Sequence, residues 1–382
     1  MKSFEHYKGR EQTFIKHFFL ENYLEKVAFN IGSFESEFVY VDGFSGPWKS
    51  SDDEYEDTSF MIALKKLRYV RDALKDRKST LNIRCLFIEK DPVAYQELKN
   101  KTDAIDDIEV KTINGEFENK TQEIINFIGK SFSLVFIDPK GWTGYSLQKI
   151  KPILNLRGEV VINFMFDHIS RFVDTSSEAI KKSIDDLGGD GFGKNIQKLI
   201  TEGYNREEAI LKVYMDRLKT TGNFSYVTST RVLKPNQERT YFHLVYGTKH
   251  EKGLFEFREI ERKLFEEQNK VRKSTQQRRR VESTGQSELF GPGTLPDSSH
   301  LAEYRASQLD LAQRQLDDLI LEPSSIPYEK ILYSLFQNEF VWKRDVNDMI
   351  KDLCEKGKIK LSGLGPRERS PKVNCDHKIL RK

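Results

Sequence analysis

The sequence has few cysteines, no long apolar run and no glycine-rich dinucleotide fingerprint, and each absence excludes a class of protein. Its three cysteines, Cys85, Cys354 and Cys375, form no Cys-x-x-Cys pair, so neither a zinc ribbon nor a disulfide framework is expected. No apolar stretch approaches the ~20 residues that span a bilayer. Residues 1–19 contain no apolar segment followed by small residues, as a secretory signal would. We therefore expect a soluble cytoplasmic protein with no membrane association.

Charge is nearly balanced overall but unevenly distributed. The chain has 382 residues, enough for two or three domains, with 32% charged and 37% apolar residues and a net charge of +3. Residues 356–382 hold nine Lys or Arg against Glu368 and Asp376, a net charge of +7, so the rest of the chain carries −4. A basic tail on a mildly acidic body favours a partner with a phosphate backbone. The alternative is a solvated surface segment.

The segment Phe38-Val-Tyr-Val-Asp-Gly-Phe-Ser-Gly-Pro47 predicts a buried strand that runs into a glycine turn. Gly43 and Gly46 permit close backbone approach, and Asp42 can accept hydrogen bonds from an amine or a hydroxyl. Such a turn lies at the carboxyl edge of a sheet, where open α/β folds bind small molecules. The alternative is an ordinary turn in which Asp42 caps the chain.

Other predicted strands also end in polar residues, and in a parallel sheet their ends share one edge. These strands are 83–89, closing with Glu89; 110–113, followed by Asn114-Gly-Glu-Phe117; 133–138, closing with Asp138; and 160–165.

An acid at the end of the second strand is typical of ribose binding. The spacing between Asp42 and Glu89 exceeds the usual ~20 residues, because the acidic segment 52–57 and a predicted helix intervene. We expect Glu89 to hold ribose hydroxyls and the 114–117 turn to contact an adenine ring. Residues 114–117 are equally compatible with a plain turn before the next helix.

The alternation of strands and helices predicts an α/β fold with a mostly parallel sheet. Strands at 226–233 and 241–248 should close it as an antiparallel pair. We expect this domain to cover residues 1–250, with a helical insertion at about 172–214. A connecting helix at 251–273 and a linker with a polar helix at 274–322 should follow. Residues 323–382 have the helix, turn, helix and two-stranded wing of a winged helix-turn-helix domain, with the wing strands expected at 358–362 and 372–379.

The turn Asp42–Gly46 resembles the first motif of class I methyltransferases, and Asp138–Trp142 resembles the Asp-Pro-Pro-aromatic motif of enzymes that methylate amino groups of nucleic acids. In those enzymes the acid and the proline carbonyl hold the target amine, and the aromatic ring stacks on a flipped base. The resemblance implies S-adenosylmethionine (SAM) as cofactor. The cofactor-binding residues would be Asp42, Gly43, Phe44, Ser45, Gly46, Glu89, Asn114, Glu116 and Phe117.

The same resemblance implies a catalytic set of Asp138, Pro139, Lys140, Trp142 and His17. Asp138 would orient the amine, Trp142 would stack on the base, and His17 is a candidate base or else a core histidine. Lys140 replaces the second proline of the motif. It could help to expel a product, hold a phosphate or form a salt bridge.

The chain is similar to the three-Cys-motif partner (TcmP) family. The similarity rests on Lys16-His17, Val39–Pro47, Phe136–Trp142 and Asn163-Phe-Met165, within the first 250 residues. It implies a class I methyltransferase-like, Rossmann-like domain with a terminal winged helix, and a radical SAM three-Cys-motif protein as partner.

We therefore predict a SAM-dependent methyltransferase acting on a nucleic-acid base, with DNA favoured over RNA. The alternatives are a SAM- or nucleic-acid-binding partner subunit with little or no catalysis, a scaffold, or a nicotinamide-linked oxidoreductase, against which the missing Gly-x-Gly-x-x-Gly counts. The wing can also contact protein, whereas steep salt dependence of duplex binding would indicate DNA. The predicted nucleic-acid contacts are Lys343, Arg344, Lys358, Lys360, Arg367, Arg369 and Lys372.

Overall fold

The computed structural model describes residues 3–46, 55–77, 79–284, 299–321, 324–373 and 375–381. Two compact units make up the chain, Met1–Gly253 and Leu254–Lys382. Pro47, which ends the first motif, and residues 285–298 of the expected linker lie outside the described residues. In the described part of the chain, no helix combines the length and apolarity that a bilayer span requires.

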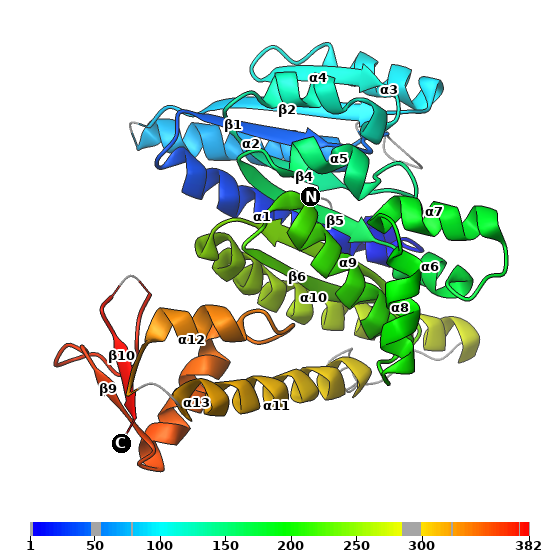
Figure 1. Ribbon diagram of the computed structural model, residues 1–382. Coiled ribbons are helices and arrows are strands. Elements are labelled where there is room, and N and C mark those ends of the chain that lie inside the picture. The colour runs from blue at the N-terminus through cyan, green and yellow to red at the C-terminus, as the bar shows by residue number, and fades with distance from the viewer. Residues whose placement is uncertain are drawn as a thin grey trace. The chain divides into compact units, whose positions relative to one another are not determined.

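A seven-stranded sheet forms the centre of the N-terminal unit, in the order β3-β2-β1-β4-β5-β7-β6 (Figure 1). Strands β1 to β5 are parallel, and β7 runs antiparallel to both of its neighbours, β5 and β6. The prediction of a mostly parallel sheet with an antiparallel end is confirmed. The strands are β1 (Glu37–Asp42), β2 (Asn82–Glu89), β3 (Glu109–Asn114), β4 (Phe132–Ile137), β5 (Gly158–Phe164), β6 (Tyr226–Leu233) and β7 (Thr240–Thr248).

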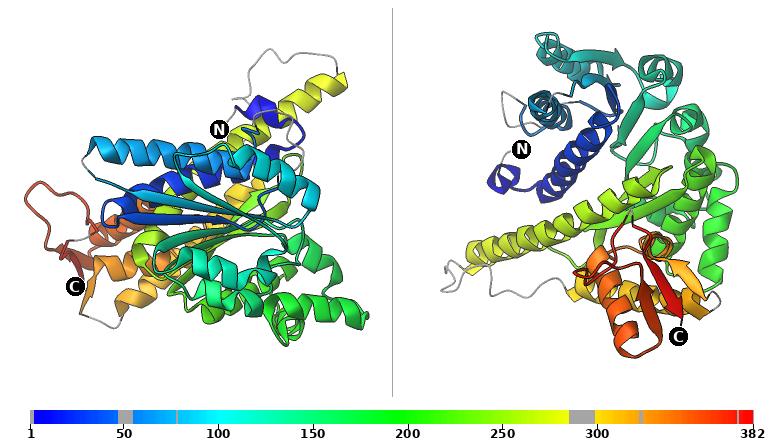
Figure 2. Two further views of the ribbon diagram at one scale, coloured as in Figure 1. Left: turned by 90° about the horizontal axis from the view of Figure 1, so that it is seen from above. Right: turned by 90° about the vertical axis from the view of Figure 1, so that its left-hand side faces the viewer.

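Helices cover both faces of this sheet (Figure 2). Four of them, α6 to α9, occupy the segment between β5 and β6, where a helical insertion was expected. The helical segments of this unit are η1 (Phe4–Tyr7), α1 (Glu11–Gly32), α2 (Ser59–Asp76), α3 (Pro92–Thr102), η2 (Phe117–Asn119), α4 (Thr121–Ile128), α5 (Leu147–Leu154), α6 (Phe166–Phe172), α7 (Glu178–Gly188), α8 (Phe192–Thr201) and α9 (Arg206–Gly222).

Successive side chains of β1 point to opposite faces of the sheet, and each set packs against the helices on its own face. Val39 and Val41 are fully buried in a core that also contains apolar residues of α4, α5 and α9. Tyr40 points to the opposite face, because successive side chains of a strand alternate. Its ring lies 6.3 Å from that of Phe87, which lies 5.9 Å from the ring of Phe60 on α2. Burial on both faces is what continuous apolar strands predict.

The register brings the polar strand ends to one edge of the sheet. Asp42 pairs with Phe87 of β2 and with Phe136 of β4. Glu89 pairs with Asn114 at the end of β3. The polar residues that the sequence places after successive strands are therefore neighbours in space.

The C-terminal unit contains helices α10 to α13 and a small antiparallel sheet in the order β8-β10-β9. The arrangement of α12, α13 and the β9–β10 hairpin is the predicted winged helix, and β8 adds a third strand. The elements are α10 (Glu251–Thr284), α11 (Ser299–Leu321), β8 (Ser325–Pro327), α12 (Tyr328–Leu335), α13 (Lys343–Glu355), β9 (Ile359–Ser362) and β10 (Lys378–Arg381).

Two boundaries differ from the sequence-based expectation. Helix α10 continues to Thr284 instead of ending near residue 273, because Thr275 is buried and the Gln and Arg residues that follow it favour a helix. The last strand begins at Lys378 instead of residue 372. Before this strand, the Lys372 amide donates a hydrogen bond to Nδ1 of His377 at 2.8 Å.

Candidate cofactor and substrate site

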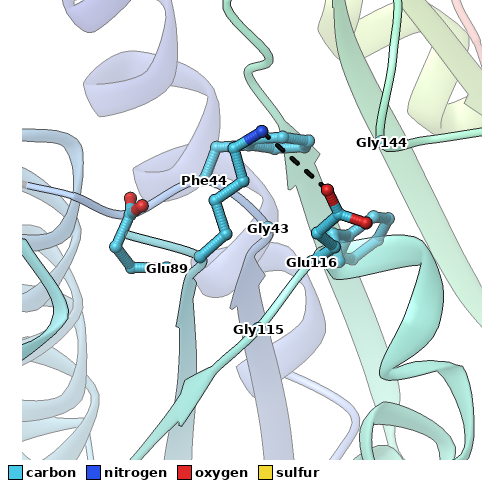
Figure 3. Close-up of a pocket in the computed structure, with 8 residues that line it drawn as sticks. Gly43, Phe44, Glu89, Gly115, Glu116 and Gly144 are labelled. Atoms are coloured by element: carbon cyan, nitrogen blue, oxygen red, sulfur yellow. Dashed lines mark ion pairs between the residues drawn. The ribbon is translucent and has the colours of Figure 1, made fainter. Parts of the chain in front are cut away.

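The ends of β1, β2 and β3 surround a hollow at the carboxyl edge of the sheet (Figure 3). It is small and partly open to solvent. Backbone hydrogen bonds hold its walls: the Gly43 amide donates to the Phe136 carbonyl at 2.9 Å, and the Gly115 amide donates to the Glu89 carbonyl at 3.0 Å. The lining residues are Gly43, Phe44, Glu89, Lys90, Gly115, Glu116, Phe117 and Gly144.

Gly43 is required at this turn because Phe117 approaches its backbone closely. A β-carbon at residue 43 would lie 2.8 Å from Cδ2 of the Phe117 ring, which is buried and cannot easily move. The Phe44 and Phe117 rings lie with their centroids 6.0 Å apart. The hollow therefore has a bare backbone wall at Gly43 with two aromatic rings beside it.

Asp42 is fully buried and stabilises the turn instead of lining the hollow. Its Oδ1 accepts a hydrogen bond from the Phe44 amide at 3.0 Å, and its Oδ2 accepts one from the Ser59 hydroxyl at 2.6 Å. Burial raises the pKa of Asp42 to about 6, against the lowering effect of these hydrogen bonds. The carboxyl group is therefore a structural part of the turn.

We expect the substitution Asp42→Asn to remove a pH dependence of stability. In the wild type, the free energy of unfolding should fall by up to about 3 kcal/mol between about pH 4 and pH 6, because the native carboxyl holds its proton where the unfolded one has lost it. Asparagine still accepts the Phe44 amide but cannot ionise. Urea unfolding of both proteins across this range measures the difference, and parallel pH profiles would contradict the assignment.

Five of the predicted cofactor residues line the hollow and four do not. Asn114 turns away, because its amide donates to the carbonyl of Glu89 at 2.9 Å, and Ser45 donates to the carbonyl of Asp42 at 2.8 Å. Those that line the hollow are Gly43, Phe44, Glu89, Glu116 and Phe117, and those that do not are Asp42, Ser45, Gly46 and Asn114.

The hollow carries both signs of charge. Glu89 is nearly buried, and its Oε1 accepts a hydrogen bond from the Asp91 amide at 2.7 Å. Its Oε2 has no hydrogen-bond partner among the described residues, so it can accept from a ligand. On the other side the Lys90 ammonium lies 4.0 Å from a carboxylate oxygen of Glu116 (Figure 3). This arrangement suits a ligand with hydroxyl donors and a zwitterionic part.

A second polar group lies at the end of β4, next to the hollow along the same edge. The Lys16 ammonium of α1 forms a short ion pair with Oδ2 of Asp138, and both side chains are mostly buried. The amide of Asn163, at the end of β5, donates to Oδ1 of Asp138 at 2.7 Å. Three elements thus converge on one carboxylate.

On β1 and β5, the two strands that flank β4, two buried polar atoms have no partner in the described part of the chain. They are the Tyr40 hydroxyl and Oδ1 of Asn163. Burial, and then the charges of Asp42, Cys85 and Asp138, raise the pKa of Tyr40. Buried polar atoms are normally hydrogen-bonded. One spare donor and one spare acceptor therefore remain for a bound polar group.

Trp142 is placed beside this group by α6 and α7. Its indole N–H donates to the Ser183 hydroxyl at 3.0 Å, and its ring lies 5.8 Å from His168 and 5.6 Å from Phe172. It remains partly exposed, as a stacking surface must be. Of its motif neighbours, Pro139 is buried and Lys140 is exposed.

His17 does not join the Asp138 group. Its Nδ1 lies 3.1 Å from the Tyr7 hydroxyl, and the side chain is 4% exposed. Burial lowers its pKa, and the charges of Lys16 and Arg10 lower it further. The structure therefore places this candidate base in the packing between η1 and α1.

Sequence reasoning assigned no site role to five residues of the two groups, which are Lys90, Gly115, Gly144, Lys16 and Asn163. Lys90, Gly115 and Gly144 line the hollow, and each is adjacent to or within a few residues of a predicted motif. Lys16 stands 122 positions before Asp138, and no local pattern connects them.

The predicted nucleic-acid contacts of the C-terminal unit lie on α13, on the turn between α13 and β9, on β9 and on the loop after β9. Arg344 is 89% exposed and lies 3.7 Å from Asp348, and Lys372 pairs with Glu368 at 2.8 Å. Lys343 is half-buried, with its ammonium 5.8 Å from the Phe255 ring. The remaining contacts, all exposed, are Lys358, Lys360, Arg367 and Arg369.

Comparison with known proteins adds little beyond the architecture. No family model matches the chain, and no curated protein matches it. Among solved structures it is similar to protein LPL1258 from Legionella pneumophila, of the family DUF519, with 13% identity over 62% of this chain and 84% of the other at a TM-score of 0.36. It is also similar to loganic acid methyltransferase with SAH, with 9% identity over 68% and 83% of the two chains at a TM-score of 0.31.

The strand order and the antiparallel β7 define a Rossmann-like fold of the class I methyltransferase type, joined to a small winged-helix unit. Within this class, the hollow occupies the edge at which open α/β sheets bind ligands. The Asp138 group lies on the adjacent strand end, where a second substrate could approach.

Proposed function

We propose that the protein is a SAM-dependent methyltransferase that acts on an amino group of a nucleic-acid base, with DNA favoured over RNA. The observation that carries the proposal is the adjacency of two groups at one sheet edge. A hollow lined by the carboxylate of Glu89 lies at β1 to β3, and the partly buried carboxylate of Asp138 lies next to it at β4 and β5.

The hollow fits the parts of SAM. Glu89 offers a carboxylate oxygen to the ribose hydroxyls, and Phe44 and Phe117 offer apolar surface to the adenine. Lys90 and Glu116 match the carboxylate and the ammonium of the amino-acid part. The backbone at Gly43 gives the ligand close access because no β-carbon can stand there.

When bound, SAM would supply a methyl group: the amine nitrogen would bond to the methyl carbon as the carbon–sulfur bond breaks in line, S-adenosylhomocysteine would leave, and Asp138 could take the proton that the nitrogen loses. The residues of this chain have to position the amine and exclude water. Asp138 and Oδ1 of Asn163 can accept the hydrogens of the amine, and Trp142 can stack on the base that carries it. The Lys16 ammonium now holds the place at Asp138 that the amine would take.

A second candidate function is favoured by that same ion pair. If Lys16 stays on Asp138, the carboxylate cannot hold a target amine, and Lys140 in place of a motif proline adds another cation nearby. The protein would then be a SAM- or nucleic-acid-binding subunit with little or no catalysis. A radical SAM three-Cys-motif protein, as the TcmP resemblance implies, would be its partner.

Titration of the full chain with SAM in a calorimeter tests the cofactor assignment. We expect saturable one-to-one binding, and we expect Glu89→Gln to weaken it by about tenfold or more, because hydrogen bonds to a charged group contribute about 1.5–3 kcal/mol. Glu109→Gln is the matched control. It removes an exposed carboxylate at the opposite, amino end of β3 and should change SAM affinity by less than about twofold.

The outcomes separate the two candidate functions. If the wild type does not bind SAM, the cofactor assigned in both candidate functions is wrong. Binding that Glu89→Gln leaves unchanged would place SAM elsewhere. Binding without methyl transfer to any DNA or RNA would favour the partner subunit over the enzyme.

A further inference from the structure

A cluster of cations surrounds one buried carboxylate next to Trp142. Asp167, on α6, is 5% exposed in its side chain, and Arg171, Lys234 and Arg239 all converge on it. Arg171 Nη2 lies 2.8 Å from Oδ2, Arg239 forms a short ion pair with Oδ1, and the Lys234 ammonium lies 4.0 Å from Oδ2. We call these four residues the Asp167 cluster.

The fold brings the cluster to the same edge as the candidate site. Helix α6 directly follows β5, whose end holds Asn163 (Figure 1). Because β7 is antiparallel, its first residues lie beside the end of β5, with His243 opposite Phe164. The β6–β7 turn, which carries Lys234 and Arg239, is therefore at the carboxyl edge, and the Lys234 amide donates to the Arg239 carbonyl at 2.8 Å.

Trp142 connects the cluster to the proposed base site. Its ring packs on His168 and Phe172, and these residues flank Asp167 and Arg171 on α6. A nucleotide stacked on Trp142 would thus have its backbone within the neighbourhood of α6.

The charges of the cluster suit an anion. Two arginines share the single carboxylate of Asp167, and their side chains are 58% and 52% exposed. Asp167 holds each guanidinium by one side, which orders it and leaves other N–H donors toward solvent. Lys234 also lies 5.8 Å from the partly exposed Tyr241 ring. Ordered arginines with an aromatic neighbour are typical of contacts to a phosphate backbone.

The neighbouring charged group is balanced and is not part of the site. Glu207 accepts hydrogen bonds from Thr240 at 2.8 Å and lies 3.0 Å from His243 and 3.5 Å from Arg231. Arg231 is almost fully buried, so this group serves the packing of β6, β7 and α9.

We propose that Arg171, Arg239 and Lys234 bind phosphodiester groups of a nucleic-acid strand, next to the nucleotide that stacks on Trp142. The proposal rests on the proposed function and gives its substrate a second contact, on the methyltransferase-like unit itself. The winged helix is then not the sole nucleic-acid surface of the chain.

Fluorescence anisotropy of the full chain with labelled single-stranded and duplex oligonucleotides, without SAM, tests this surface. The variant Arg171→Gln/Arg239→Gln should bind about tenfold more weakly at low salt, and the slope of log affinity against log salt should fall by about 1 to 2, since each phosphate neutralised contributes ~0.9. The matched control is Arg68→Gln/Arg71→Gln. These arginines also share one carboxylate, Asp107, but at the amino end of β3, and their loss should change affinity by less than about twofold.

Asp167→Asn distinguishes lost binding from lost folding. It removes the negative charge and keeps the cations, so affinity at low salt should rise or stay equal, opposite to the arginine variant. Both variants binding more weakly would mean disrupted packing and would overturn the proposal. An arginine variant with unchanged affinity and salt slope would also overturn it.

A competitor separates phosphate recognition from general anion binding. Unlabelled oligonucleotide should displace the probe at far lower charge concentration than polyglutamate, and equal competition would overturn the proposal. Because SAM is absent throughout, failure of this test is independent of the calorimetric test. If the chain binds SAM but its oligonucleotide affinity does not depend on Arg171 and Arg239, the proposed cofactor stands. Only the proposed phosphate-binding surface is then contradicted.

Discussion

Replacement of Arg258 by methionine is expected to destabilise the C-terminal unit by about 3–5 kcal/mol near pH 8. Arg258 and Glu261 of α10 are both fully buried, with Nη1 and Oε1 2.5 Å apart. The guanidinium also donates to the Phe336 carbonyl at 2.8 Å. Oε2 of Glu261 accepts from the Phe340 amide and from the Trp342 indole, each at 3.1 Å. The variant leaves this carboxylate buried without its counter-charge.

The loss of stability caused by Arg258→Met should increase as the pH rises. Burial raises the pKa of Glu261 to about 7, and the charge of Arg258 opposes that rise. Without Arg258 the native pKa moves still higher. A carboxyl with a raised native pKa contributes stability at low pH and loses it as the pH rises through that pKa. The difference in unfolding free energy between wild type and variant should therefore grow from about pH 6 to about pH 9.

Hydrogen exchange of the full chain, followed on peptides of α12 and α13, measures this unit separately from the other. Arg262→Met is the matched control, on the same helix. Arg262 is 40% exposed and pairs with Glu266 at 3.1 Å, so its loss should change stability by about 0.5 kcal/mol or less. Equal protection in the Arg258 variant and the wild type would show that the buried pair does not hold the unit together.

Features that depend on neighbours along the chain could be predicted from the sequence. Uninterrupted apolar runs that end in Asp42, Glu89 and Asp138 indicate strands buried on both faces, and parallel pairing then places their ends together. Gly43, directly after Asp42, indicated a turn in which the backbone is closely approached. These local signals were sufficient for the sheet and for the position of the hollow.

Features that depend on distant partners could not be predicted. Asp42 was expected to face a ligand, but its carboxylate accepts a hydrogen bond from the hydroxyl of Ser59 on the next helix. Lys16 reaches Asp138 across 122 positions, and only the packing of α1 on the sheet determines that contact. His17 is buried because η1 folds back onto α1 and brings Tyr7 to its ring.

The Asp167 cluster also depends on contacts between residues far apart in the sequence, so it could not be predicted either. Arg171 follows Asp167 by one helical turn, a spacing that predicts an ordinary surface pair. Arg239 reaches the same carboxylate across 72 positions. The convergence exists because β7 returns antiparallel to β5, so the sequence pattern of either segment alone contains no sign of it.

The substitution Asp138→Asn is expected to lower methyl transfer to DNA by about 10²–10³-fold, within the range by which a single group that positions or stabilises the reacting atoms contributes to catalysis. Asparagine keeps one oxygen but replaces the other acceptor by an NH₂ donor, which repels a target amine. SAM affinity should change by less than about threefold, because Asp138 does not line the hollow. Transfer of a labelled methyl group and calorimetric titration of the same preparations measure the two effects.

Lys16→Met separates the two functions proposed for this carboxylate. In the enzyme, the target amine replaces the Lys16 ammonium at Asp138, so removal of Lys16 should leave at least about a tenth of the activity. Asp103→Asn, an exposed aspartate paired with Lys99 at 2.6 Å, is the control and should leave transfer unchanged. Wild-type transfer that survives Asp138→Asn would contradict the role of this residue. If wild type and Lys16→Met both bind SAM without transferring its methyl group, Asp138 holds no target amine, and the chain acts as a binding subunit.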